Sequence, residues 1–136
     1  MGQAGYREFL TILKDQKPGE AVLWHCTQGK DRTGLASMFL LSALGVDEET
    51  ILTDYELSNV YYDKKVKALE KLAAEKGYGA KTIEKIQAMI GVNREVMEYT
   101  LKVLKEKYGS VEQYLHHQLG VTDEDIQELK EKYLQR

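Results

Sequence analysis

The sequence predicts an α/β fold that is mostly helical, with one central strand at residues 21–25 that leads into a loop at 26–32. Apolar residues recur at helical spacing over most of the chain, whereas Ala21–His25 is a short apolar run typical of a buried strand. A single strand cannot satisfy its own backbone groups. We therefore expect the remaining strands of the sheet to be missing or supplied by another segment, and a structure without a strand at 21–25 would refute this.

Each helix is predicted from an apolar face and a start or stop signal. Pro18-Gly19 is predicted to form the turn that precedes the strand. The second helix is apolar nearly all round, as expected of a central helix, and Gly45 ends it. Asp47, Asn93, Ser110 and Thr122 are candidate N-caps. The predicted helices cover 4–15, 33–44, 47–57, 62 to about 77, 83–90 and 93–108, followed by two that begin after 110 and 122.

Length and composition indicate one globular domain over residues 1–136. The chain is 43% hydrophobic and 30% charged, and its net charge of −3 gives no electrostatic case for a nucleic-acid partner. No apolar run is long enough to span a bilayer. The single cysteine excludes a disulfide within the chain.

The most informative segment follows the predicted strand and reads HCTQGKDRTG over residues 25–34. It places Cys26 and Arg32 at the two ends of a tight loop that leads into a helix. A thiol ionises more readily at a helix N-terminus and beside cations. Backbone N–H groups that line such a loop form a nest for an anion. The loop is therefore predicted to bind an oxyanion and to attack it through sulfur.

The other residues of the segment have supporting roles in this prediction. Gly29 lets the backbone bend close to a ligand. The Thr33 hydroxyl, at the start of the helix, is placed to stabilise the thiolate. The His25 side chain is expected to order the loop by hydrogen bonds to the loop backbone. Gly34 allows the first helical turn to pack against the strand. The phosphate-binding set is predicted to be Thr27, Gln28, Gly29, Lys30, Asp31 and Arg32, with Arg32 as a planar fork for two oxygens.

Cys-x5-Arg-Thr preceded by His resembles the signature loop of the cysteine-dependent protein tyrosine phosphatase superfamily. The longer string is similar to a bacterial branch with HCxxGKDRTG that acts on phosphoproteins and phosphoinositides. Residues 54–59, DYELSN, resemble the DYxxSN segment of that branch, and residues 108–115 and 119–122 resemble its C-terminal helices. The resemblance implies a tyrosine-phosphatase-like fold and a hydrolase.

The implied mechanism uses Cys26 as nucleophile, Arg32 as phosphate clamp and a phosphocysteine intermediate, without a metal or organic cofactor. Asp31 is a candidate general acid, although it could instead neutralise Lys30 or orient Arg32. Lys30 is a candidate ligand for a second phosphate, or else a solvated lysine. The expected partners are a phosphorylated protein or a phosphoinositide, with phosphate or a similar oxyanion in the loop. Low-molecular-weight phosphatases fit less well, because their acid lies in a downstream Asp-Pro step and Pro18 is upstream.

Members of the branch carry a substantial N-terminal half before the loop. The resemblance therefore implies that this chain corresponds to the C-terminal part of a phosphatase domain, completed by an N-terminal segment or a swapped copy. The alternative to an active enzyme is a non-catalytic fragment or subunit that binds phosphate and needs such a partner for activity. The sequence is compatible with either a cytoplasmic or a secreted protein.

Overall fold

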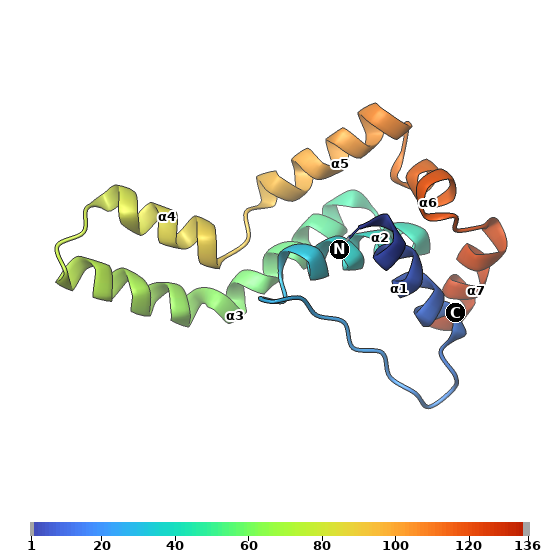
Figure 1. Ribbon diagram of the computed structural model, residues 1–136, viewed down its shortest axis with the longest axis horizontal. Coiled ribbons are helices and arrows are strands. Elements are labelled where there is room, and N and C mark those ends of the chain that lie inside the picture. The colour runs from blue at the N-terminus through green and yellow to red at the C-terminus, as the bar shows by residue number, and fades with distance from the viewer. Residues whose placement is uncertain (1, 135–136) are drawn as a thin grey trace.

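The computed structural model describes residues 2–134, which form seven helices and no strand. Figure 1 shows α1, α2, α6 and α7 gathered in one body, from which α3 extends and α4 returns beside it. Helix α5 then leads from the α3–α4 hairpin back to α6. The helices are α1 (Gln3–Asp15), α2 (Asp31–Leu44), α3 (Glu48–Glu75), α4 (Ala80–Ile90), α5 (Arg94–Tyr108), α6 (Val111–Leu119) and α7 (Asp123–Tyr133).

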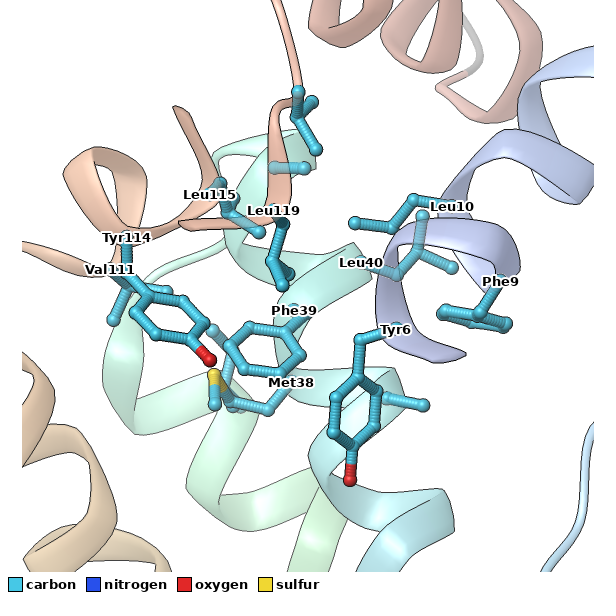
Figure 2. Close-up of a cluster of buried hydrophobic side chains, with 14 of the residues drawn as sticks. Tyr6, Phe9, Leu10, Met38, Phe39, Leu40, Val111, Tyr114, Leu115 and Leu119 are labelled. Carbon is cyan, nitrogen blue, oxygen red and sulfur yellow. The ribbon is translucent and has the colours of Figure 1, made fainter. Parts of the chain in front are cut away.

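The core lies where α1 and α6 cover α2 (Figure 2). The Phe39 ring stacks on Tyr114 at a centroid distance of 5.4 Å and meets the edge of Tyr6 at 5.1 Å. Leu115 and Leu119 of α6 are fully buried against this cluster. Helix α2 is thus held from both sides, as its nearly continuous apolar sequence predicts, and its N-terminus is a fixed platform for the loop that precedes it.

The predicted helix starts are confirmed at all four candidate caps. The side chains of Asp47, Asn93 and Ser110 accept hydrogen bonds from backbone N–H groups in the first turns of α3, α5 and α6. Thr122 and Asp125 form a capping box at the start of α7. These signals are local, so the sequence alone was sufficient to place them.

Helix α3 differs from the prediction, which divided this region into two helices. The structure has one helix of 28 residues from Glu48 to Glu75. Residues 58–61 contain neither glycine nor proline, so no stop signal ends the helix between the two predicted segments.

Of the helices described between residues 2 and 134, none has both the length and the apolar character needed to cross a bilayer.

The predicted strand at 21–25 is wrong, and with it the α/β class expected for this chain. Residues 20–26 are extended but irregular, and Figure 1 shows them in a long connection between α1 and α2. Side chains still alternate: Val22 and Trp24 pack on the core, while Leu23 is 88% exposed. A strand needs a neighbour to pair its backbone groups, and no second extended partner lies in residues 2–134. The described chain is all helical, and the expectation that further strands of a sheet are supplied by another segment is therefore wrong by the criterion given above.

Helices from the two ends of the chain cap each other through side chains. Lys132 and Tyr133 of α7 donate hydrogen bonds to the Leu13 carbonyl at the end of α1, at 3.3 and 3.0 Å. Arg7 of α1 in turn donates through Nε to the Leu119 carbonyl at the end of α6, at 2.7 Å. These groups would otherwise be unpaired helix-terminal carbonyls. Helix α1 is therefore fixed to α6 and α7 by polar contacts as well as by the core.

Candidate active site

The loop between the extended segment and α2 brings the predicted site residues together. Helix α2 begins at Asp31, two residues before the predicted start, so Asp31 and Arg32 lie in its first turn. Cys26 is half-buried and begins the loop, and Gly29 turns it with a φ of +67°. This φ lies in the left-handed region, where glycine avoids the strain that other residues experience.

The Cys26 thiol has an environment that favours the thiolate. Partial burial raises its pKa, but hydrogen bonds from the Thr33 hydroxyl and from the backbone N–H groups of Thr33, Gln28 and Lys30 outweigh this, and the pKa falls to about 6. The Thr33 hydroxyl is buried and has no hydrogen-bond partner within residues 2–134. Ionised sulfur would be an acceptor for this hydroxyl, whose effect is to lower the pKa of Cys26.

Arg32 and His25 are exposed side chains that contact the loop from its two ends. Arg32 Nη2 donates to the Thr27 hydroxyl at 2.9 Å, so the guanidinium reaches from the C-terminal end of the loop back to its start. His25 Nδ1 is 3.3 Å from the carbonyl oxygen of Cys26, a contact with the backbone of the loop. The exposed guanidinium thus has donors free to take an oxyanion.

Lys30 points away from the mouth of the loop. Its side chain is only 5% exposed, and its ammonium donates to the carbonyls of Met89 at 2.6 Å and Gly91 at 2.8 Å. Both acceptors lie at the C-terminal end of α4, where the helix dipole favours a cation. Contact between Lys30 and a second phosphate stays a prediction, and in this structure the ammonium is engaged elsewhere.

Sequence reasoning assigned no site role to two residues of α3 that support the loop. The Tyr62 hydroxyl donates to the carbonyl of Gln28. Asn59 holds the segment after α4: its Nδ2 donates to the Val92 carbonyl at 3.1 Å, and its Oδ1 accepts from the Val92 N–H at 2.8 Å. Asn59 ends the DYELSN segment, whose resemblance to the phosphatase branch was the one available signal.

Gly34 packs against Tyr55 of α3 rather than against a strand. A Cβ at position 34 would lie 2.7 Å from Cδ2 and Cε2 of the Tyr55 ring. Tyr55 is itself buried, so its ring has little room to move. Close contact between α2 and α3 behind the loop therefore requires glycine.

Gly34→Ala is expected to lower the free energy of unfolding by about 1–3 kcal/mol, because the added methyl group displaces a packed ring. Urea denaturation followed by circular dichroism measures the change. Gly79→Ala is the matched control, since a Cβ there meets nothing within 4 Å and its φ is not positive. An alanine at 34 that is as stable as the control would contradict this account of the contact.

Two hollows lie near the loop. One is lined by Asp31 and Arg32 together with residues of α1, α3 and α5, and it lies at the N-terminus of α2. A larger hollow of about 540 Å³ lies between α3 and α4 and contains neither Cys26 nor Arg32. The first hollow includes Arg32 at the end of the loop, and Cys26 lines neither hollow. Within the described residues, no three His, Cys, Asp or Glu side chains are grouped as a metal site.

Comparisons with known proteins agree with this geometry. Residues 1–135 match the tyrosine phosphatase family. A protein named as a tyrosine-protein phosphatase in Cupriavidus necator is 34% identical over 131 residues, which are 95% of this chain and 45% of the relative. A tyrosine-protein phosphatase of Nostoc commune is 31% identical over 94% of this chain and 44% of its own length.

A third relative is the triple specificity protein phosphatase PtpB of Mycobacterium tuberculosis, 27% identical over 83% of this chain and 43% of its own length. The chain thus spans somewhat less than half the length of the curated relatives it matches. The family match nevertheless covers nearly the whole chain, and it confirms the family resemblance: the chain belongs to the tyrosine phosphatase family, whose members are hydrolases.

Proposed function

We propose that this chain carries the catalytic loop of a phosphate-monoester hydrolase that works through a phosphocysteine. The observation that carries the proposal is the set of donors around Cys26, which lowers the pKa of the thiol to about 6 beside the Arg32 guanidinium. A thiolate at neutral pH is a competent nucleophile. The same N–H groups are suited to the charge of a phosphoryl group in the transition state.

The reaction has two steps. The Cys26 sulfur forms a bond to phosphorus, the bond from phosphorus to the leaving oxygen breaks, and that oxygen takes the proton of Asp31. Water then attacks phosphorus, its proton passes to the Asp31 carboxylate, and the sulfur–phosphorus bond breaks. Arg32 and the loop N–H groups hold the non-bridging oxygens in both steps. No metal or organic cofactor takes part.

The proposed substrate is a phosphotyrosine protein, with phosphoinositides as a further class. The family and the two relatives named as tyrosine-protein phosphatases support the first. The name of the Mycobacterium tuberculosis relative, triple specificity protein phosphatase, supports a wider range. An open hollow beside Arg32 suits either class better than an enclosed pocket would.

Trapping the intermediate tests the proposal. The chain is mixed with an aryl phosphate, quenched in acid within one turnover, and its Cys26 peptide is weighed by mass spectrometry. We expect the peptide to gain the mass of one phosphoryl group, at the only cysteine in the chain. Turnover without a labelled peptide would contradict the covalent mechanism. No turnover from a folded chain would favour the alternative in which it binds phosphate and needs a partner segment for activity.

A further inference from the structure

The buried Lys30 side chain connects the loop to the end of α4 through its ammonium group. It donates to two backbone carbonyls, Met89 at 2.6 Å and Gly91 at 2.8 Å, and forms no ion pair among the residues described. Burying an ammonium is costly unless its donors are satisfied. Burial of the Lys30 ammonium is therefore favourable only while the carbonyls of Met89 and Gly91 stay in place to accept its hydrogen bonds.

Asn59 fixes those positions from the other side. Its side-chain amide makes two hydrogen bonds with Val92, the residue after Gly91. A planar amide that both donates to and accepts from one residue fixes the orientation of that backbone. The segment after α4 is thus attached to α3 by Asn59 and to the loop by Lys30.

Tyr62 provides a second, independent attachment. Its hydroxyl donates to the Gln28 carbonyl, in the middle of the loop. Gln28 and Lys30 are also the two residues outside α2 whose N–H groups lower the pKa of the Cys26 thiol, whereas the third, Thr33, belongs to α2 itself. Each of these two residues is therefore held by the α3–α4 hairpin, through a different side chain.

We propose that Asn59, Tyr62 and the Lys30 side chain are positioning residues: they hold the backbone of Gln28 and Lys30 in place in the loop that begins at Cys26, and so make the α3–α4 hairpin part of the catalytic apparatus. The proposal rests on the proposed role of Cys26 as nucleophile. It also gives Lys30 a different function from that of a phosphate ligand, because its hydrogen bonds to Met89 and Gly91 exist before any substrate binds.

The test is the pH dependence of alkylation of the sole cysteine by iodoacetamide, in a buffer without phosphate. The wild-type chain is expected to show a midpoint near pH 6. Tyr62→Phe and Asn59→Leu are expected to raise the midpoint by about half a pH unit or more, because each loosens the loop backbone whose N–H groups favour the thiolate. Neither variant changes a charge. The titratable neighbours of the thiol, Tyr6 of α1 and the adjacent His25, stay the same, as do Asp31 and Arg32 in the first turn of α2.

Matched controls separate positioning from general loosening. Tyr61→Phe removes the neighbouring hydroxyl, on a side chain that is 85% exposed. Asn93→Ala removes the cap of α5 one residue beyond Val92 and leaves the Asn59 contacts in place. We expect the wild-type midpoint for both. If circular dichroism shows that Asn59→Leu is unfolded, Tyr62→Phe carries the test, since it removes a single oxygen atom.

Midpoints for folded Tyr62→Phe and Asn59→Leu that coincide with wild type would overturn the proposal, and so would equal shifts in the controls. Alkylation needs no turnover, so this result is independent of whether the chain hydrolyses a phosphate ester. A low wild-type midpoint that rises in the two variants, without any hydrolysis, would support the positioning role and count against the proposed function.

Discussion

Replacing Cys26 by serine is expected to lower kcat/KM for an aryl phosphate by on the order of 10⁶-fold, as when the nucleophile of a hydrolase is removed. The donors that bring the pKa of the thiol to about 6 cannot ionise a hydroxyl at neutral pH. The loop N–H groups and Arg32 are unchanged, so binding of inorganic phosphate should persist. Initial rates and calorimetric titration with phosphate measure the two properties separately.

Arg32→Met is the comparison variant, because it should lose phosphate binding while it keeps the thiol. Its guanidinium is exposed and contacts Thr27, so the methionine leaves no buried group unpaired. Cys26→Ser with activity within tenfold of wild type would contradict the nucleophilic role. Loss of phosphate binding in Cys26→Ser alone would indicate that the sulfur, and not the donors, holds the ligand.

Asp31→Asn is expected to lower kcat by about 10²–10⁴-fold for phenyl phosphate, the range for loss of a general acid, and by much less for nitrophenyl phosphate. A phenolate leaves poorly without a proton, whereas a nitrophenolate leaves well without one. Asp31 is exposed at the first position of α2 and lines the hollow beside Arg32, where a leaving group would lie. Steady-state rates with the two esters measure the difference.

Asp123→Asn is the matched control, since Asp123 also begins a helix, α7, and the change removes the same charge from a helix N-terminus. It should leave both rates unchanged. An equal loss for the two esters in Asp31→Asn would contradict a role as acid and favour the alternative in which Asp31 orients Arg32.

The parts of this fold that sequence predicts well are those that depend on neighbours along the chain. Caps such as Asp47 and Thr122 bond to N–H groups three residues away, so their pattern is visible in the sequence. Residues 21–25 show the opposite case. Their alternation of inward and outward side chains was real, but a strand also needs a distant partner, and that is absent from the described residues.

The same distinction applies to the site. Cys26, Arg32 and Thr33 lie within one short stretch, so their association could be predicted. Tyr62 and Asn59 reach the loop and its support only because α3 continues unbroken past residue 57 and α4 folds back beside it. An unbroken α3 was not predicted, and the contacts that depend on it could not be either.

The contacts between α1 and the last two helices bear on how the site assembles during synthesis. Arg7 and Leu119 are 112 positions apart, so α1 leaves the ribosome long before α6 and α7 exist. Pairings over such separations close large loops and form late. The segment with Cys26 joins α1 to α2, and it is tethered at both ends only after α1 has docked. The low pKa of the Cys26 thiol should therefore arise only at the end of folding.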